Sequence, residues 1–312
     1  GGELEPRFDR PVAPGGYAWW YVDALSEDGQ HGLTVIAFVG SVFSPYYWWA
    51  GHRRPEDHVA INVCLYGPQR HHWAMTERGA SALERSPRSF RVGPSGLAWQ
   101  DGRLTIDFHE RSSPFPRVKP YPMRGRITLE AETLTGHEIA LTGSGRHRWW
   151  PIAPIARAEV AVDEPAIRWT GHGYMDMNMG DEMLEQGFRR WDWSRARLSS
   201  GAAVLYDMEP QAGGRETLCL LVRPDGTVEP FDAPPRARLP RGWWGVARET
   251  LSDGPARILR GFEDSPFYTR AAISSEILGE RVPAVHETLD CRRFASPVVK
   301  AMLPMRMPRR VR

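Results

Sequence analysis

The sequence predicts an all-β protein made of two antiparallel β units in series. Short aromatic or β-branched runs recur along the whole chain, glycine (30) and proline (27) are plentiful between them, and helical patterns are scarce. A chain of 312 residues that is 41% hydrophobic and 25% charged is long enough to form two domains, each with a core of its own.

The first half contains the clearest strand patterns. The expected strands are 18–22, 32–39, 59–65, 71–76, 97–100, 103–110 and 123–129. Asp101-Gly102 separates two of these runs, and this dipeptide is typical of a hairpin turn in which both central residues have positive φ. The segment 80–85 is expected to be a short helix.

The second half repeats the same character. The expected strands are 166–170, 188–198, 201–208, 216–222, 245–250, 256–259, 267–277 and 285–289, and a short helix is expected at 298–303. Three prolines cluster between 151 and 165, which places the junction near residue 160. The predicted domains are therefore residues 1–160 and 161–312.

Charge and cysteine content narrow the functional classes. The net charge is +2, with 40 basic and 38 acidic side chains, so no nucleic-acid partner is expected. Cys64, Cys219 and Cys291 are far apart, which favours a reducing compartment over a disulfide framework. No apolar run reaches about 18 residues, so no spanning helix is expected. The end, 302–312, is either a frayed tail or a weak contact with anionic lipid.

Tryptophan is unusually abundant, with 13 residues, and eight of them form adjacent pairs. These pairs are Trp19-Trp20, Trp48-Trp49, Trp149-Trp150 and Trp243-Trp244. Neighbouring side chains on a strand point to opposite faces, so each pair is expected to direct one indole inward and one outward. A single pair is typical of core filling, whereas the whole set indicates an aromatic-lined channel for a long apolar ligand.

The richest polar stretch runs from 145 to 197. Tyr174, Asp176 and Asn178 are spaced by two, so on an extended segment a phenol, a carboxyl and an amide face the same way. The intervening methionines, at 175, 177 and 179, would then face an apolar layer. The stretch is therefore the first candidate for a reactive site.

Other uses of these polar groups are less well supported. A metal site could draw on His147, His172, Asp176 and Asp181, but no compact ligand motif such as H-E-x-x-H is present, so no metal is expected. There is no G-x-S-x-G, P-loop or strand-linked G-x-G-x-x-G, which leaves nucleophilic catalysis and nucleotide cofactors without a motif. A purely structural role for Asp176, binding turn amides, stays open.

Several long, aromatic-rich segments carry a family resemblance. They are GGYAWWYVDALSEDGQHGLTVIAFVGSVFSPYY (15–47), AMTERG (74–79), LTGHEIAL (134–141), GRHRWWPIAP (145–154), GHGYMDMNMGDE (171–182) and FRRWDWSRAR (188–197). At these segments the chain resembles the carotenoid 1,2-hydratases of purple photosynthetic bacteria, also called hydroxyneurosporene synthases. The resemblance extends from near the start to about residue 197.

The resemblance implies a fold and an activity. The fold would be two lipocalin-like antiparallel β-barrel domains in tandem, a scaffold also used by some fungal pericyclases. The activity would be that of a cofactor-independent hydro-lyase of the spheroidene and spirilloxanthin pathways. It would add water across the C1–C2 double bond of acyclic carotenoids such as neurosporene and lycopene to give a tertiary alcohol.

The resemblance also implies partners and a location. Its partners would be the acyclic carotenoid, water, membrane lipid and other enzymes of the carotenoid pathway. The protein would be cytoplasmic and peripheral on the photosynthetic, intracytoplasmic membrane. Aromatic residues 46–49 or the basic tail would supply the lipid contact.

The family's implicated residues match His147, Trp149, Tyr174 and Asp176. Asp176 is expected to be the acid, because burial in an apolar pocket favours a protonated carboxyl group. Trp149 is expected to stabilise the tertiary cation through its ring face. Tyr174 is expected to hold the acid or to supply a second π face, and His147 is expected to orient the incoming water and to accept its proton. The roles of these two residues are interchangeable.

A wider set of residues is expected to bind the substrate: Trp150, His172, Asn178, Trp191 and Trp193. Two other functions fit the same apolar channel. One is a lipocalin-like carrier of carotenoid or lipid without chemistry. The other is a pericyclase or isomerase, which would depend on the shape of the pocket and would survive the loss of Asp176.

Overall fold

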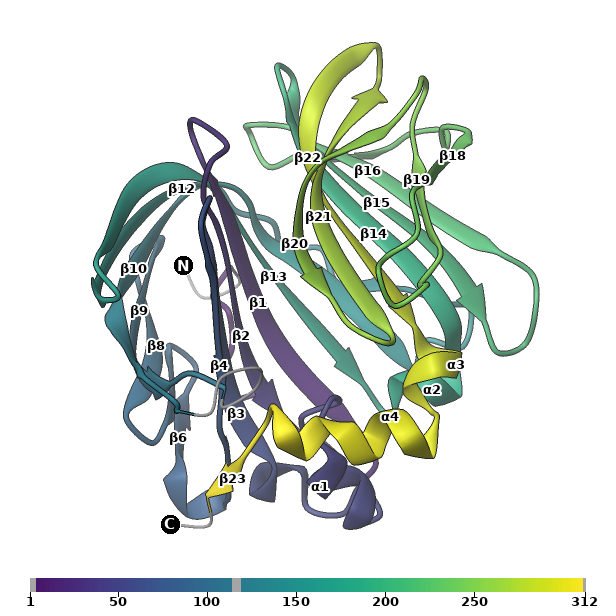
Figure 1. Ribbon diagram of the computed structural model, residues 1–312. Helices are drawn as coiled ribbons and strands as arrows, with labels where there is room; N and C mark the ends of the chain where they lie inside the picture. Colours follow the sequence, from purple (N-terminus) through teal and green to yellow (C-terminus); the bar gives the residue numbers. More distant parts are fainter. Residues whose placement is uncertain (1–3, 114–118, 311–312) are drawn as a thin grey trace. The chain divides into compact units, whose positions relative to one another are not determined.

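The computed structural model describes residues 4–113 and 119–310, and most of its regular structure is β-strand (Figure 1). The chain divides into two compact units. The first comprises the residues up to Ala140, Ser144–Met183 and the residues from Ala301; the second comprises Leu141–Gly143 and Leu184–Lys300. The prediction of an all-β protein built from antiparallel β units is confirmed. Residue 160 lies inside one strand, β12 (His147–Glu164), and the chain enters the second unit after Met183.

The first unit contains one 14-stranded sheet. Its strands are β1 (Tyr17–Ser26), β2 (Gly32–Val39), β3 (Val59–Tyr66), β4 (His71–Met75), β5 (Glu77–Arg78), β6 (Leu83–Ser86), β7 (Ser89–Val92), β8 (Ser95–Gln100), β9 (Arg103–Arg111), β10 (Pro122–Thr133), β11 (Ile139–Ala140), β12, β13 (Ile167–Gly180) and β23 (Arg309–Arg310). The main order is β23-β5-β3-β2-β1-β13-β12-β10-β9-β8-β7-β6, with β4 beside β3 and β11 beside β12. Helix α1 (Pro45–Trp49) and three 3₁₀ turns (Pro55–Asp57, Ala80–Ala82 and Leu303–Met305) complete the unit.

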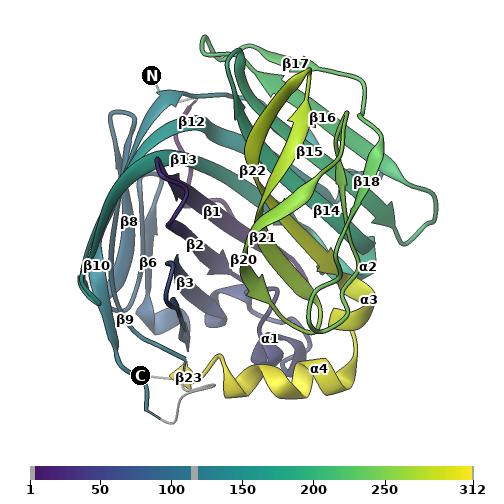
Figure 2. The same ribbon diagram turned by 45° about the horizontal axis from the view of Figure 1, so that its top comes forward.

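This sheet curls, as Figure 2 shows, and buried apolar side chains on its inner face form a core. Trp20 on β1 lies 5.6 Å from the ring of Phe90 on β7, although the two strands are far apart in the strand order. Phe8 packs between them, 5.3 Å from Trp20 and 6.3 Å from Phe90. Burial of these large rings on one face fixes which side of each strand points inward.

The second unit has a 7-stranded sheet in the order β17-β16-β15-β14-β22-β21-β20 and a separate pair, β18-β19. Its strands are β14 (Phe188–Leu198), β15 (Gly201–Pro210), β16 (Glu216–Val222), β17 (Val228–Pro230), β18 (Arg236–Leu239), β19 (Arg248–Leu251), β20 (Arg257–Asp264), β21 (Tyr268–Ile277) and β22 (Glu280–Asp290). Its short helices are α2 (Leu184–Gly187) and α3 (Cys291–Phe294). Helix α4 (Pro297–Met302) lies where the chain returns to the first unit.

Several local predictions can be compared with the structure. The hairpin at Asp101-Gly102 is confirmed, because both residues have positive φ, 48° and 80°. The helix expected at 80–85 is wrong: a 3₁₀ turn covers only Ala80–Ala82 and is followed by β6. The tail is not frayed over its described part, because β23 pairs in parallel with β5. The long strands β12 and β13 were expected only in part, at 166–170.

The tryptophan pairs fall into two groups. Those on strands alternate as expected: Trp20 and Trp150 belong to the core of the first unit, and their neighbours Trp19 and Trp149 are buried on the other face. The other two pairs do not lie on strands. Trp48 and Trp49 end helix α1, and Trp243-Trp244 lies in a loop, and all four of these indoles are at least 38% exposed.

Candidate active site

The candidate site lies on the face of β13 that points away from the core of the first unit. Tyr174, Asp176 and Asn178 share this face and are buried, with at most 3% of each side chain exposed. The methionines at 175, 177 and 179 belong to the core cluster on the opposite face. The alternation predicted from the spacing is therefore confirmed.

Two neighbouring side chains donate hydrogen bonds to the carboxyl group of Asp176. Nε1 of Trp149 lies 2.8 Å from Oδ2, and the hydroxyl of Tyr174 lies 2.7 Å from the same oxygen. Trp149 lies on β12 opposite Asn178 of β13. Its indole therefore extends diagonally, to Asp176 two residues before Asn178. Tyr174 is two residues before Asp176 on the same face. Three predicted catalytic residues are thus brought together.

A second tyrosine and aspartate pair lies on the neighbouring strand, β1, beside Tyr174 and Asp176. The hydroxyl of Tyr21 donates to Oδ2 of Asp23 at 2.8 Å, and both side chains are buried. In the antiparallel register Tyr21 lies opposite Asp176 and Asp23 lies opposite Tyr174. The two tyrosine rings meet edge to face with centroids 6.1 Å apart. The sequence interpretation missed this pair, although Tyr21-Val22-Asp23 repeats the Tyr-x-Asp spacing of Tyr174-Met175-Asp176.

His147 is buried on the same face but bonds to other groups. Its Nδ1 is hydrogen-bonded to the hydroxyl of Tyr17 at 2.9 Å, and its Nε2 lies 3.3 Å from Oε1 of Glu182. Burial lowers the pKa of His147, and the nearby Glu182 carboxylate partly opposes this by raising it. His147 pairs with Gly180, four residues beyond Asp176 on β13. The imidazole is therefore neutral near pH 7 and is separate from the acid.

Glycine at position 180 makes the close approach of these rings possible. A Cβ atom there would lie 2.4 Å from Cε1 of Tyr17 and 2.9 Å from Nδ1 of His147. Tyr17 also stacks on Trp19, with ring centroids 4.8 Å apart, and Trp19 lies opposite Asn178. His147 thus supports an aromatic wall that continues along β1 beside the candidate acid.

The structure separates the five expected substrate-binding residues. Asn178 is buried beside Trp149 in the strand register. Trp150 lies on the opposite face, in the core, where Nε1 donates to the backbone oxygen of Thr135 at 2.7 Å. His172 shares the face of Tyr174 but is exposed. The remaining two, Trp191 and Trp193, belong to the second unit and pack edge to face on Tyr206.

Another buried carboxyl group lies in the second unit. Burial raises the pKa of Asp192 to about 7, although Arg190 lowers it. The guanidinium of Arg190 donates to both carboxyl oxygens, at 2.9 and 3.0 Å, and Thr288 donates a further hydrogen bond. A carboxyl group held in this way is typical of a structural ion pair rather than of a proton donor to an alkene.

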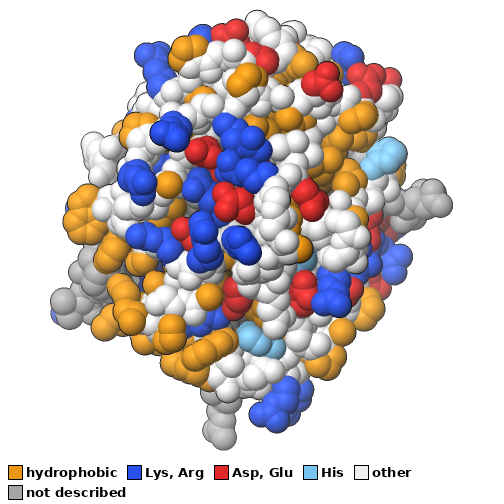
Figure 3. Space-filling view, turned by 90° about the vertical axis from the view of Figure 1, so that its right-hand side faces the viewer, with side chains coloured by type: hydrophobic (Ala, Val, Ile, Leu, Met, Phe, Trp, Pro, Cys, Tyr) orange, Lys and Arg blue, Asp and Glu red, His pale blue; other side chains and the backbone are white. Residues whose placement is uncertain are grey.

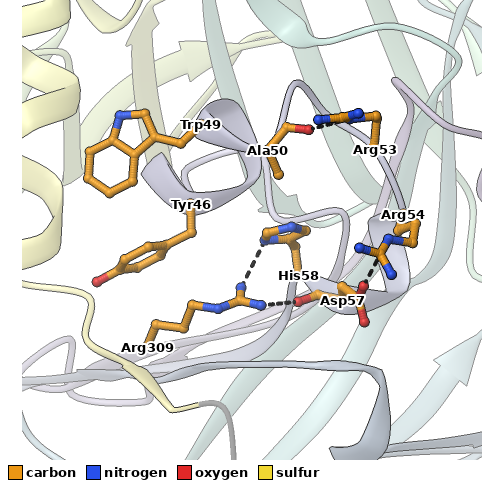
Figure 4. Close-up of a pocket in the computed structure, with 8 residues that line it drawn as sticks. All are labelled: Tyr46, Trp49, Ala50, Arg53, Arg54, Asp57, His58 and Arg309. Carbon is orange, nitrogen blue, oxygen red and sulfur yellow. Dashed lines mark hydrogen bonds and ion pairs between the residues drawn. The ribbon is translucent and has the colours of Figure 1, made fainter.

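The surface of the first unit carries a hollow of about 630 Å³ beside α1 (Figure 4). Its lining residues are Tyr46, Trp49, Ala50, Arg53, Arg54, Asp57, His58 and Arg309. Trp49 is 56% exposed, and Arg53 is exposed and donates from Nε to the backbone oxygen of Ala50 at 3.0 Å. Arg54 pairs with Asp57 at 3.3 Å. The hollow therefore combines an exposed indole with guanidinium groups.

Basic side chains also gather, with acidic ones among them, on the face seen in Figure 3. In the second unit Arg215 lies 3.1 Å from Glu209 and 3.0 Å from Glu249, and Arg236 contacts both oxygens of Asp207. These ion pairs neutralise part of the basic charge of the second unit.

Three further findings concern only residues 4–113 and 119–310. No three His, Cys, Asp or Glu side chains there converge as ligands of a metal ion. None of the helices in those ranges has the length and apolar character needed to cross a bilayer. Cys64, Cys219 and Cys291 are buried.

Comparison with known proteins identifies the family. The family model described as carotenoid hydratase CrtC matches residues 35–312. The acyclic carotenoid 1,2-hydratase of Thiocapsa roseopersicina is 49% identical over 310 residues, which is 97% of this chain and 76% of that protein. The enzyme of the same name from Rubrivivax gelatinosus is 47% identical over 313 residues, 98% of this chain and 76% of that protein.

Solved structures of low sequence identity share the fold. An AttH protein of Nitrosomonas europaea has a TM-score of 0.62 at 13% identity and covers 91% of this chain and 96% of its own. CghA, solved with Sch210972, has a TM-score of 0.60 at 12% identity and covers 93% and 92%. The matched family model and the two bacterial relatives agree with the resemblance of the sequence motifs. The chain belongs to the carotenoid hydratase CrtC family.

Proposed function

We propose that this protein adds water across the C1–C2 double bond of an acyclic carotenoid, with Asp176 as the proton donor. The observation that carries the proposal is the buried carboxyl group of Asp176, bound through Oδ2 by Trp149 and Tyr174. A trisubstituted alkene is a very weak base, so it needs a carboxylic acid that keeps its proton until the alkene is in place.

The two hydrogen bonds hold the carboxyl group of Asp176 through one oxygen. Trp149 and Tyr174 both donate to Oδ2, so this oxygen acts as an acceptor while the group is protonated. After the proton has moved to C2, the same two donors stabilise the carboxylate that remains. The arrangement therefore supports both protonation states of the acid during a turnover.

Proton transfer to C2 leaves a tertiary cation at C1, the more substituted carbon. The aromatic rings around Asp176 are those of Trp149 and Tyr174, which donate to it, and Tyr21, which packs on Tyr174. A cation over a desolvated ring face gains about 2 kcal/mol or more, and indole is the best of the common rings. Each step needs only a carboxyl group, aromatic rings and water, so we propose a reaction without a cofactor.

The contacts support different roles for Tyr174 and His147. Tyr174 holds the acid directly, at 2.7 Å. His147 contacts Tyr17 and Glu182 instead, so we assign it a positioning role for the aromatic wall of Tyr17 and Trp19. Asn178 and Trp19, which lie opposite each other, are the nearest candidates for contacts with the polyene end.

The decisive experiment is product analysis with neurosporene and lycopene under argon, in light and heavy water. Wild-type protein should form the tertiary alcohol with deuterium at C2. Asp176→Asn keeps an acceptor for Trp149 and Tyr174 but lacks the acidic proton, so hydration should fall by at least about a hundredfold. Asp107→Asn, an exposed residue paired with Arg126, is the matched control. Wild-type hydration by Asp176→Asn would falsify the assignment.

The carotenoid substrate lives in a membrane, so we also propose peripheral contact with anionic lipid through the hollow beside α1. Interfacial tryptophan and clustered arginine are typical of such contacts. Of the four aromatic residues first considered, Tyr47 is buried and bonded to the backbone oxygen of Gly16 at 2.8 Å. The proposal therefore rests on Trp49, Arg53 and Arg54, all of which are exposed.

Sedimentation with carotenoid-free vesicles tests this contact. Wild-type protein should bind phosphatidylcholine vesicles more tightly when they contain phosphatidylglycerol. Replacing both Arg53 and Arg54 by Gln should weaken that binding by about thirtyfold, since each arginine near an anionic surface contributes about 1 kcal/mol. Arg238→Gln, at an arginine whose side chain is 92% exposed in the second unit, is the control. Equal binding by the double variant and the control would rule out this surface.

A further inference from the structure

The proposed reaction leaves the buried carboxyl group of Asp23, in the second tyrosine and aspartate pair, without a role. We infer that Asp23 is the general base, which accepts the proton of the water molecule that attacks C1. The inference rests on the proposed function, because it assigns the second half of the same reaction. It is drawn from the crossed arrangement of Tyr21-Val22-Asp23 and Tyr174-Met175-Asp176 on paired strands.

The strand register fixes the spacing of the two aspartates along the sheet. Asp23 lies opposite Tyr174, and Asp176 lies opposite Tyr21, so the aspartates are diagonal neighbours on the same face. Diagonal neighbours in an antiparallel pair have Cα atoms about 7–8 Å apart. Both side chains therefore start close enough to act on one alkene and one water molecule, without sharing a single strand position.

Asp23 is placed to accept a proton within the site. Its side chain is 1% exposed and accepts a hydrogen bond from the Tyr21 hydroxyl, at 2.8 Å. Asp176 is buried as well and accepts hydrogen bonds from Trp149 and Tyr174 at Oδ2. The site thus offers two buried carboxyl groups, each held by a tyrosine of its own strand, so one can protonate C2 while the other takes the proton of water.

The proposed steps balance. The O–H bond of Asp176 breaks and a C–H bond forms at C2 from the electrons of the double bond, which leaves the cation at C1. The water oxygen then forms a bond to C1, one of its O–H bonds breaks, and that proton goes to the carboxylate of Asp23. The sum is alkene plus water giving tertiary alcohol. The proton on Asp23 returns to Asp176 before the next turnover.

Loss of a base has a signature that loss of the acid lacks. In Asp23→Asn, Asp176 still protonates C2, but the cation is no longer captured efficiently and gives a proton back to the Asp176 carboxylate. In heavy water the recovered carotenoid should therefore acquire deuterium at C2, while alcohol formation falls by about a hundredfold or more. Asp176→Asn should show neither exchange nor hydration.

The experiment compares Asp23→Asn, Tyr21→Phe, Asp176→Asn and the control Asp107→Asn, each with its thermal unfolding. Tyr21→Phe keeps the carboxylate and removes its hydrogen bond, so it should slow hydration less than Asp23→Asn and retain exchange. Hydration by Asp23→Asn at the wild-type rate would overturn the inference. Loss of both exchange and hydration in a folded Asp23→Asn protein would also overturn it. Exchange by Asp176→Asn would instead contradict the proposed function.

Discussion

The indole nitrogen of Trp149 lies 2.8 Å from Oδ2 of Asp176, and both side chains are almost completely buried. The N–H edge of the indole holds the carboxyl group. The role that we propose for the ring face, stabilising the cation, belongs to a different part of the same side chain. Substitutions can separate the two.

Trp149→Phe removes the N–H donor and keeps an aromatic face, whereas Trp149→Leu removes both. A hydrogen bond to a charged group contributes about 1.5–3 kcal/mol, so Trp149→Phe should slow hydration by roughly 10- to 100-fold. Trp149→Leu should be slower by a further tenfold or more, from the lost cation–π interaction of about 2 kcal/mol. Rates for neurosporene hydration measure both effects. Equal rates for the two variants would show that the ring face contributes nothing.

The pH dependence of hydration should report on His147. Burial holds the pKa of His147 below its ordinary value of 6.5, so the neutral ring that bonds Tyr17 is lost only at acid pH. Glu182 raises this pKa, and Glu182→Gln should therefore move the acid limb of the hydration rate to lower pH. Asp181 also raises the pKa of His147, but less than Glu182 does, so Asp181→Asn should move the acid limb less. A shift to higher pH in Glu182→Gln would contradict the positioning role.

His286 should make the second unit sensitive to acid. Its Nε2 donates to the backbone oxygen of Glu249 at 2.7 Å, and burial lowers its pKa to about 4 from 6.5. Below pH 6.5 the unfolded chain takes up a proton that the folded protein does not, so stability is lost as the pH falls from 6.5 to 4. This loss amounts to about 2 kcal/mol at pH 5 relative to pH 8.

Urea unfolding of wild type and His286→Gln at these two pH values measures the effect. The variant is needed because Asp192 acts with the opposite sign. Its folded-state pKa of about 7 lies above the ordinary 3.8, so its contribution to stability is complete below pH 3.8 and is lost as the pH rises to 7. The difference between the wild-type and variant free energies of unfolding should therefore change by about 2 kcal/mol. An unchanged difference would mean that His286 titrates normally.

Gly180→Ala should disturb the aromatic wall. The new Cβ atom would lie 2.4 Å from Cε1 of Tyr17, so Tyr17 and His147 must move apart. Overpacking of this kind costs typically about 1–3 kcal/mol, and hydration should fall because Tyr17 no longer supports Trp19. Gly79→Ala has no atom within 4 Å of its Cβ and serves as the control for both unfolding and activity. Wild-type stability and rate in the Gly180→Ala variant would show that these rings are free to shift.

The sequence could predict the fold class and three members of the site because these depend on short-range alternation. Tyr174, Asp176 and Asn178 share a face wherever the segment is extended, and the structure keeps that pattern over β13. Trp149 was found through the family motif, and its hydrogen bond to Asp176 follows from strand pairing that no local pattern specifies.

The failures have equally local causes. Trp48-Trp49 was interpreted as a strand pair, but Ser44 caps a helix there by accepting a hydrogen bond from the backbone of Tyr47, and Pro45 occupies its first turn. Trp150 was expected to bind the substrate, but it points to the opposite face from Trp149 and lies in the core, because consecutive residues on a strand alternate. Tyr21 and Asp23 were missed because their relation to β13 depends on a register between segments about 150 residues apart, which spacing within one segment does not reveal.

A single strand, β13, supplies the side chains of Met175, Met177 and Met179 to the hydrophobic core on one face and the carboxyl group of Asp176 on the other. Deleting or inserting one residue within β13 would exchange the two faces. Asp176 would then point into the apolar core, and the methionines would point into the candidate site. Deleting or inserting two residues would keep each side chain on its face but would shift Asp176 along the sheet, away from Trp149 and Tyr21. Evolution of new polyene specificity in this lineage is therefore expected to proceed by swapping individual side chains along the strand, with its length held constant.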